Sequence, residues 1–151
     1  MQARAAGEQV LQLVTFTLGI EEYAVDILSV QEINRITEIG QVPNAPVFIE
    51  GVINLRGKVI PVINLRKKLG LEDREIDESS RIIIMDIQGV TTGLLVDSVS
   101  EVLRIPVDVV ESAPPLSESM ASKFIQGIAK LENRLLILID SDKLIGETVQ
   151  I

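Results

Sequence analysis

Short runs of apolar residues, separated by turns, follow one another along most of the chain. Residues 10–18, VLQLVTFTL, alternate apolar and polar positions, which predicts a β-strand with one side facing solvent. Residues 23–33 predict two strands or one strand with a bulge, and residues 92–102 predict a similar strand region later in the chain. Residues 81–87 form a further apolar strand between these two regions. We therefore expect an all-β fold with only a few short helices.

The order of these elements repeats most clearly in two hairpins. Residues 51–70, GVINLRGKVIPVINLRKKLG, predict strand, turn, strand and short helix, and residues 127–146 follow the same plan without a gap. The turns fall at residues 56–57 and 132–133, and each ends in a residue, Gly or Asn, that tolerates a positive φ. The same turn geometry is therefore expected twice. Pro61 cannot donate a ladder hydrogen bond, which predicts an edge strand or a bulge in the first hairpin.

A second repeat joins the segments that precede the hairpins. The tetrapeptide VQEI at residues 30–33 corresponds to VSEV at residues 99–102, and apolar positions before them match at the same spacing. The spacing between the hairpins is longer, so additional residues lie in the second half, where residues 112–122, SAPPLSESMAS, indicate a loop. The repeat predicts two similar halves, residues roughly 10–76 and 77–147, packed about a pseudo-twofold axis.

Each half is too small to be comfortably stable alone. We therefore expect one domain over residues 10–147, with interlocked halves, after a flexible N-terminal tail of residues 1–9. Short strands and tight turns predict that each half forms a small barrel, because closure hides the edges of apolar strands. Hydrophobic residues make up 46% of the 151 residues and aromatic residues only 3%, so the core has to be built from Val, Ile and Leu.

Charge and missing residue types narrow the function. The chain has no cysteine, which excludes disulfides and thiolate metal sites, and no histidine, which removes the commonest general base and metal ligand. The formal net charge of −8 disfavours nucleic acid and anionic membrane surfaces. No apolar run is long enough to span a bilayer, and no secretion signal is present, which predicts a cytoplasmic protein. We expect no cofactor, metal site, nucleic-acid partner or membrane insertion.

Carboxylates are numerous, so a small carboxylate-based hydrolase with a duplicated β-barrel fold is one alternative. Neighbouring acids on a strand point to opposite faces, and no phosphate loop, metal motif or nucleophile elbow is present. The sequence therefore predicts no catalytic residue. The acids that this alternative would draw on are Glu21, Glu22, Asp26, Glu32, Asp97, Glu101, Asp140 and Asp142.

Two charged residues stand beside apolar segments. Glu32 lies in an apolar strand region, and Arg56 lies at the first hairpin turn. They form either an ion pair that determines strand register or part of a charged binding surface, and both interpretations stay open. Four apolar residues at matching places in the two halves belong either to the core or to a groove for an amphipathic helix. These four are Val30, Ile33, Val99 and Val102.

Three segments resemble the CheW family of bacterial chemotaxis coupling proteins. They are FIEGVINLRGKVIPVINLRKKL at residues 48–69, FTLGIEEYAVDILSVQEI at residues 16–33 and LLVDSVSEVL at residues 94–103. The resemblance extends from about residue 9 to residue 144. It implies two interlocked five-stranded SH3-like barrels and a non-catalytic adaptor.

The resemblance also implies partners and a binding site. The expected partners are the histidine kinase CheA, through its regulatory domain of the same fold, and the cytoplasmic tips of methyl-accepting chemoreceptors. Binding to both would recruit this cytoplasmic protein to membrane-associated signalling arrays. Kinase-facing surfaces are expected at the outer ends of the two halves. The receptor-coupling residues of the family fall on Val30, Glu32, Arg56 and Val102, with Ile33 and Val99 beside them.

Overall fold

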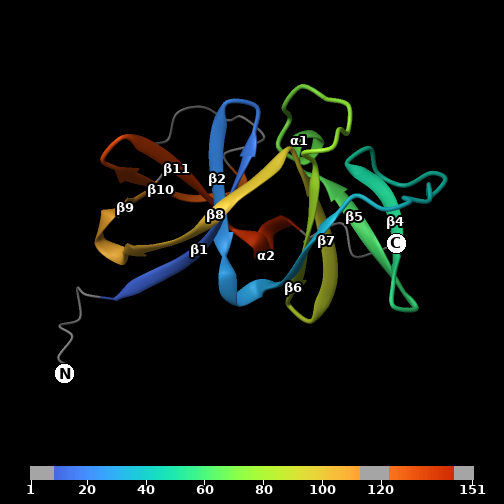
Figure 1. The fold of residues 1–151 in the computed structure, drawn as a ribbon, viewed down its shortest axis with the longest axis horizontal. Helices are drawn as coiled ribbons and strands as arrows, with labels where there is room; N and C mark the ends of the chain where they lie inside the picture. Colours follow the sequence, from blue (N-terminus) through green and yellow to red (C-terminus); the bar gives the residue numbers. More distant parts are fainter. Residues whose placement is uncertain (1–8, 113–122, 145–151) are drawn as a thin grey trace.

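The protein folds into two β-sheets that lie side by side, with two short helices (Figure 1). A computed structural model describes residues 9–112 and 123–144, so the predicted tail, the loop at 112–122 and the end of the domain fall wholly or mostly outside it. The six-stranded sheet has the order β8 (Ser98–Pro106), β1 (Val10–Leu18), β2 (Glu21–Asp26), β11 (Arg134–Ile139), β10 (Ile125–Leu131) and β9 (Val110–Glu111). The five-stranded sheet has the order β3 (Val30–Arg35), β6 (Arg81–Ile87), β7 (Val90–Val96), β5 (Lys58–Asn64) and β4 (Ile49–Leu55). Helix α1 is Leu65–Lys68, and helix α2 is Ser141–Leu144.

The two sheets have the same topology, which confirms the predicted all-β fold and its internal repeat. Strands β8, β1, β2, β11 and β10 correspond in order to β3, β6, β7, β5 and β4. Each sheet is antiparallel except for one parallel pair, β2 with β11 and β5 with β7. The sheets do not follow the two sequence halves. Residues 30–96 alone form the five-stranded sheet, whereas the six-stranded sheet combines residues 10–26 with residues 98–139.

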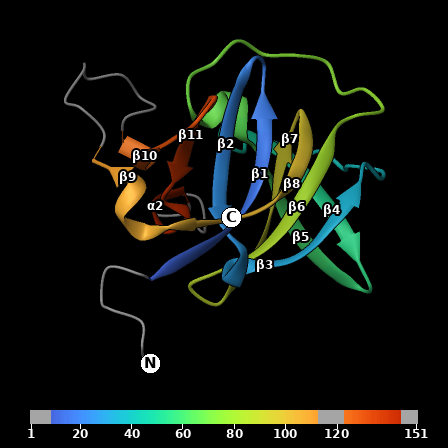
Figure 2. The same ribbon diagram turned by 60° about the vertical axis from the view of Figure 1, so that its left-hand side comes forward.

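Three buried clusters make up the core, and one of them joins the two sheets. The strands of both sheets twist and curve (Figure 2), and each sheet packs a small aliphatic cluster of its own. A larger cluster is shared between the sheets and includes Phe16, Ile83, Met85 and Leu94. Central strands are therefore buried on both faces. At about 25 cal/mol per Å² of buried apolar surface, this shared burial is the main stabilising term of the fold.

Strand β1 shows the effect of burial on both faces. Its alternating sequence predicted one side in solvent, and this was wrong, because the side chain of Thr15 is fully buried. The hydroxyl of Thr15 donates to the carbonyl oxygen of Glu101 (3.2 Å) and lies 3.2 Å from the backbone nitrogen of Glu101, which donates to it. Thr15 and Thr17, whose hydroxyl lies 2.7 Å from that of Ser98, thus serve the contact with β8, the neighbour of β1 in the six-stranded sheet.

The two hairpins have loops of the same length but different turn geometry. Leu55 pairs with Lys58, and Leu131 pairs with Arg134, so each loop has two residues. Arg56 and Gly57 have φ values of 51° and 87°, the left-handed pair that suits a tight hairpin. Among the described residues, positive φ at non-glycine positions occurs at Asn44, Arg56 and Gln88. The turn at residues 132–133 is not among them, so the expected second copy of this geometry was wrong.

The glycine that begins each hairpin is required by close backbone approach. The pairing of β4 with β5 shifts by one residue just before Gly51, and that of β10 with β11 shifts just before Gly127. A Cβ atom on Gly51 would lie 2.2 Å from the carbonyl oxygen of Gly40, and one on Gly127 would lie 2.8 Å from that of Glu111. The repeat therefore preserves a bulge with a crossing strand packed directly against its backbone.

Pro61 lies in strand β5, which has neighbours on both sides, but at Pro61 itself β5 is paired only with β4, so the predicted edge position holds locally. Its partner Val52 directs its N–H and carbonyl groups away from β5, to Gly40 (2.8 Å each). The pairing of β5 with β7 begins only at Val62. The proline therefore occupies a position of the ladder that needs no N–H donor.

A buried ion pair ties the β1–β2 turn, helix α1 and the β7–β8 junction together. Arg66 donates from Nε and Nη2 to the two carboxylate oxygens of Asp97 (2.9 and 2.6 Å). The N–H of Gly19 (2.7 Å) and Nη1 of Arg74 (2.8 Å) also donate to Asp97. The side chains of Arg66 and Asp97 are only 14% and 10% exposed. Asp97 thus accepts from three separate segments of the chain.

A cation–π contact joins matching positions of the two sheets. The ammonium group of Lys68, in α1, lies 3.8 Å from the ring centroid of Phe48 and 5.3 Å from that of Phe124. Phe48 and Phe124 precede the corresponding strands β4 and β10. The lysine therefore contacts both copies of the repeat at once.

Candidate functional site

The edge strands β3 and β8 carry the predicted site and share an irregularity. Residues 23–33 form two strands, β2 and β3, linked by a 3₁₀ turn, which is one of the two predicted outcomes. The pairing of β3 with β6 shifts between Val30 and Glu32, and the pairing of β8 with β1 shifts between Val99 and Glu101. The matched tetrapeptides therefore both contain a β-bulge. A bulge redirects the side chains that follow it, so each glutamate is aimed differently from a residue of a regular strand.

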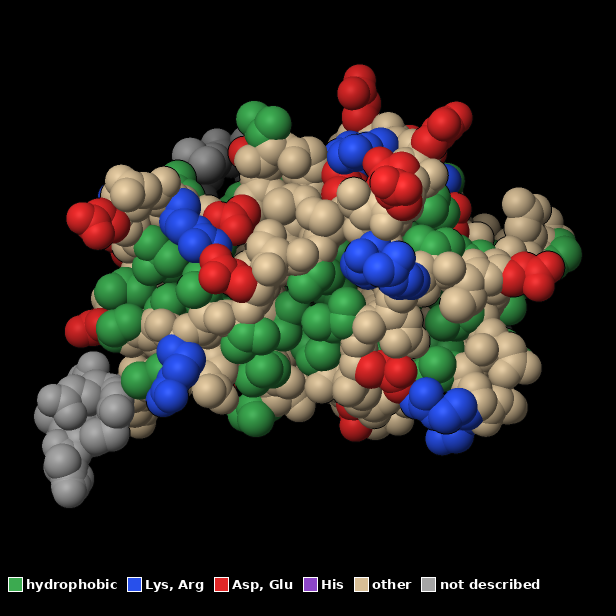
Figure 3. All heavy atoms as spheres, in the orientation of Figure 1, with side chains coloured by type: hydrophobic (Ala, Val, Ile, Leu, Met, Phe, Trp, Pro, Cys, Tyr) green, Lys and Arg blue, Asp and Glu red, His purple; other side chains and the backbone are tan. Residues whose placement is uncertain are grey.

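The four predicted apolar residues divide into an inner and an outer pair. Val30 and Val99 are half-buried and pack against the cluster shared between the sheets. Ile33 and Val102 lie further along the same two strands and are exposed. Hydrophobic side chains gather in the middle of the face shown in Figure 3, between the two sheets. The structure thus brings Val30 and Val99 to one cluster and leaves Ile33 and Val102 on the surface.

Glu32 and Arg56 form an ion pair across the five-stranded sheet. Arg56 Nη2 contacts Glu32 Oε2, and Arg56 Nη1 lies 3.5 Å from Glu32 Oε1. The hydrogen bond from Arg56 holds the pKa of Glu32 below its usual range. The side chain of Arg56 is 71% exposed and that of Glu32 is 29% exposed. The pair is therefore an outward-facing charged surface as well as a link between β3 and the hairpin turn.

Arg134 was not predicted from the sequence, yet it makes the most extensive ion pairing at the surface of the six-stranded sheet. It donates from Nε and Nη2 to the two carboxylate oxygens of Glu22 (2.9 and 2.8 Å), and its Nη1 lies 2.8 Å from Oε2 of Glu101. Glu101 is the counterpart of Glu32 in the repeat. The sequence does contain an arginine near the second hairpin turn. Alignment of the two hairpins matched Arg56 with Glu132, however, and Arg134 lies two residues further along the chain.

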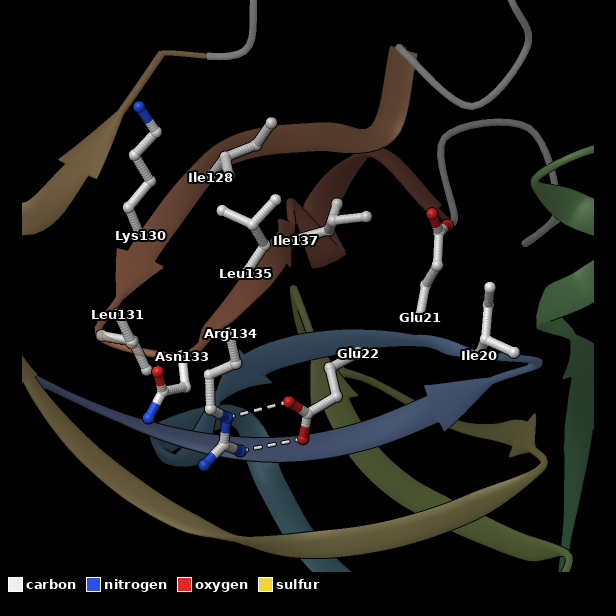
Figure 4. Close-up of a pocket in the computed structure, with 10 residues that line it drawn as sticks. All are labelled: Ile20, Glu21, Glu22, Ile128, Lys130, Leu131, Asn133, Arg134, Leu135 and Ile137. Carbon is white, nitrogen blue, oxygen red and sulfur yellow. Dashed lines mark hydrogen bonds and ion pairs between the residues drawn. The ribbon is translucent and has the colours of Figure 1, made fainter.

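An apolar pocket of about 810 Å³ opens at the outer end of the six-stranded sheet, and Figure 4 shows its lining. Its walls come from β10, β11 and the start of β2. Ile20 and Leu135 are exposed there, and Arg134 extends toward Glu22 at the rim. The five apolar lining residues are Ile20, Ile128, Leu131, Leu135 and Ile137. An exposed apolar hollow with a charged rim is the usual composition of a protein-binding surface.

Four of the eight acids of the hydrolase alternative are engaged in ion pairs, namely Glu22, Glu32, Asp97 and Glu101. Burial tends to raise the pKa of Asp97, but hydrogen bonds from Arg66 and from the Gly19 N–H outweigh burial and lower this pKa to about 2. Glu32 is held ionised by Arg56. A glycosidase-type pair needs one carboxyl group with a raised pKa, and neither of these residues provides one. The described residues also contain no group of three or more acids placed to hold a metal ion.

No helix within residues 9–112 and 123–144 is long and apolar enough to cross a bilayer.

Comparison with known proteins gives one consistent result. The CheW-like domain family matches residues 12–149. The chemotaxis protein CheW of Klebsiella aerogenes is 39% identical over 145 residues, which cover 95% of this chain and 87% of that protein. The chemotaxis protein CheW of Bacillus subtilis is 37% identical over 136 residues, or 90% of this chain and 87% of that protein. The crystal structure of the scaffolding protein CheW from Thermoanaerobacter tengcongensis matches with a TM-score of 0.85 and 40% identity, over 91% of this chain and 94% of that one.

These matches cover nearly the whole chain and agree with the duplicated two-sheet fold. They confirm the resemblance that the three sequence segments indicated. The relatives are named as chemotaxis proteins and the solved structure as a scaffolding protein, and no enzymatic activity is expected of this chain. The chain belongs to the CheW-like domain family and is a scaffold protein of chemotaxis signalling.

Proposed function

We propose that this protein links the regulatory domain of the kinase CheA to the cytoplasmic tips of methyl-accepting chemoreceptors, in the cytoplasm and within membrane-associated arrays. The observation that carries the proposal is the pair of bulged edge strands, β3 and β8, which present matching apolar and acidic residues beside the shared cluster. A surface of this composition suits an amphipathic helix, whose apolar stripe is flanked by charged residues. The family resemblance implies that the receptor tip presents such a helix.

On the receptor side, we assign the contact to the six residues predicted from the sequence. Ile33 and Val102 supply exposed apolar area, and Val30 and Val99 support them from beneath. Glu32 and Arg56 supply paired charge at one flank. Exposed aliphatic residues next to an arginine are a frequent composition of protein interfaces.

On the kinase side, we assign one contact to the apolar pocket lined by β10, β11 and the start of β2. The pocket lies at the outer end of the six-stranded sheet, on the hairpin that is expected to face a domain of similar fold. Leu135 is its most accessible β11 side chain. Two separate surfaces allow simultaneous binding of two partners, so moderate affinities can be multiplied by the geometry of an array.

Matched valine substitutions test the receptor contact. Val102→Glu places a charge on the proposed groove, whereas Val59→Glu makes the same change at another exposed strand position, in β5. Calorimetric titration with a chemoreceptor-tip fragment should show at least about tenfold weaker binding for Val102→Glu, because an unpaired charge is buried at the interface. Val59→Glu should stay within about twofold of the native affinity for this fragment.

The same titration with the CheA regulatory domain tests the kinase contact. Leu135→Glu should weaken binding of this domain and leave binding of the receptor tip unchanged. Native protein that binds neither partner would refute the proposed function. Equal weakening of receptor binding by Val102→Glu and Val59→Glu would move the receptor contact away from β8.

Reversal of the Glu32–Arg56 pair separates its two roles. The double variant Glu32→Arg with Arg56→Glu keeps an ion pair in the same place but inverts the charges toward a partner. We expect urea unfolding to show native stability for the double variant, because the pair is exposed and its internal attraction is preserved. Receptor affinity should remain as low as in the single reversals. Full recovery of receptor affinity in the double variant would instead show that the pair only determines strand register and does not contact the receptor.

A further inference from the structure

The six-stranded sheet has its own glutamate–arginine pair at the place that corresponds to Glu32–Arg56. Glu32 and Glu101 are matched in the repeat, and each follows a β-bulge in an edge strand. Each glutamate is bound by an arginine from the neighbouring hairpin of its own sheet, Arg56 at the tip of one and Arg134 at the start of β11 in the other. The pairing is thus a repeated feature of the fold, although the two arginines occupy different positions.

Arg134 differs from Arg56 in how firmly it is held. Its side chain is 32% exposed, against 71% for Arg56. Both oxygens of Glu22 accept from it, and its remaining terminal nitrogen reaches Glu101. Glu22 pairs with Thr17 and Glu101 with Thr15, so the two carboxylates lie over the same stretch of β1. The guanidinium therefore connects β11 and β2 to β8 across the strand that separates them.

This connection reaches β8 where its ladder is interrupted. The bulge falls between Val99 and Glu101, and the hydroxyl of Thr15 binds both backbone polar groups of Glu101. Arg134 adds a contact to the side chain of the same residue. Glu101 is thus held by its backbone and its side chain together. Val102, which is 53% exposed, directly follows Glu101 after this bulge, so a change in how Glu101 is held alters the direction of the Val102 side chain.

We propose that Arg134 is a positioning residue for the receptor groove, which it serves by holding Glu101 and thereby the exposed direction of Val102 on β8. The inference rests on the proposed function for the identity of the bound helix. The two strands that carry the proposed receptor contact, β3 and β8, are each bound by a hairpin arginine, and Arg134 performs for β8 what Arg56 performs for β3. Three of the five N–H donors of its guanidinium are already used within the chain, which suits an internal anchor.

Arg134→Gln, Glu101→Gln and the double variant test this role, with Lys130→Gln as the matched control. Lys130 lines the same pocket and also carries one positive charge, but it is 66% exposed and its ammonium lies 3.9 Å from Glu111. Each single variant should weaken binding of the receptor-tip fragment by about three- to fivefold. The double variant should lose no more than the weaker-binding single variant, because both single variants remove the same Arg134–Glu101 contact. Lys130→Gln should stay within about twofold.

Backbone amide shifts of the protein alone give a second readout that does not depend on any partner. Arg134→Gln and Glu101→Gln should both change the backbone amide chemical shifts of residues 99–102, whereas Lys130→Gln should leave these chemical shifts unchanged. The proposal would be overturned if the losses of receptor affinity of the two single variants added up in the double variant. It would also be overturned if Arg134→Gln left the amide chemical shifts of residues 99–102 unchanged. If the native protein fails to bind the receptor tip, the proposed function fails, but the amide shifts still decide whether Arg134 positions β8.

Discussion

Replacement of Asp97 by Asn should cost about 3 kcal/mol of the free energy of unfolding, at the lower end of the range for a buried ion pair that loses one partner. The substitution preserves size but removes the charge, so the Arg66 guanidinium, 14% exposed, is left without its counter-ion. The N–H of Gly19 and Nη1 of Arg74 lose a charged acceptor as well. Urea unfolding at neutral pH measures the loss, which corresponds to a fall in Tm of about 6 to 12 °C for a chain of this size.

The matched control for Asp97 is Asp73→Asn in the neighbouring loop. Asp73 is 61% exposed, and Lys67 lies 3.7 Å from it. An exposed pair of this kind contributes at most about 1 kcal/mol, so the control should remain near native stability. Equal losses for the two variants would show that burial of the Arg66–Asp97 pair adds nothing to stability.

The contribution of ionised Asp97 to stability should also be visible in the pH dependence of unfolding. The pKa of Asp97 is lowered to about 2 in the folded protein, against about 3.9 in an unfolded chain. A lowered folded-state pKa means that the stabilisation is complete above about pH 5 and is lost as the pH falls from about 4 to about 2. The loss amounts to roughly 2 kcal/mol. The stability difference between native protein and Asp97→Asn should therefore shrink over this window, and a constant difference would contradict the assignment.

Gly51→Ala should destabilise the protein by about 3 kcal/mol or more, because it combines an overpacked site with an unfavourable backbone conformation. The added Cβ would lie 2.2 Å from the carbonyl oxygen of Gly40 and 2.7 Å from Cγ2 of Ile39. That carbonyl cannot withdraw freely, since Gly40 exchanges two hydrogen bonds of 2.8 Å with Val52. Gly51 also has a φ of 155°, which L-residues rarely adopt.

Gly57→Ala separates the two causes. Gly57 also has a positive φ, 87°, but a Cβ atom there would meet nothing within 4 Å. Its cost should be about 1 kcal/mol, from backbone conformation alone. Thermal and urea unfolding of the two variants give the comparison. If Gly57→Ala were as destabilising as Gly51→Ala, the close approach of Gly40 would not be the reason for the glycine.

The sequence predicted the fold well where both copies of the repeat have the same local structural requirement at matching positions. Gly51 and Gly127 matched because both are crossed closely by another backbone, and the tetrapeptides of β3 and β8 matched because both contain a bulge. Such constraints act locally, so they remain visible in the amino-acid pattern. Which strands share a sheet was not visible, because pairing between distant strands depends on the path of the whole chain.

Predictions failed where a tertiary contact overrode a local pattern. Thr15 looked like a solvent-facing residue of an alternating strand, but its hydroxyl binds the bulge of β8 and is buried. The turn at residues 132–133 resembled the turn at 56–57 in composition, yet it does not share the positive φ values. The role of Arg134 was not predicted because its position does not correspond to that of Arg56 in the repeat. Its long side chain nevertheless reaches Glu101. The spacing of residues along the chain does not show which partners a long side chain contacts, and it does not show how the strands are divided between the two sheets.

The exchange of strands between the sheets also dictates an order of completion during synthesis. The five-stranded sheet uses residues 30–96 only, so all of its strands are available before the last third of the chain exists. The hairpin of β1 and β2 is made first but cannot find its neighbours β8 and β11 until residues 98–139 have left the ribosome. Leu13 and Ala24, which belong to the cluster of the six-stranded sheet alone, are therefore buried late, and a ribosome that pauses within this interval prolongs the exposure of the unpaired edges of this hairpin.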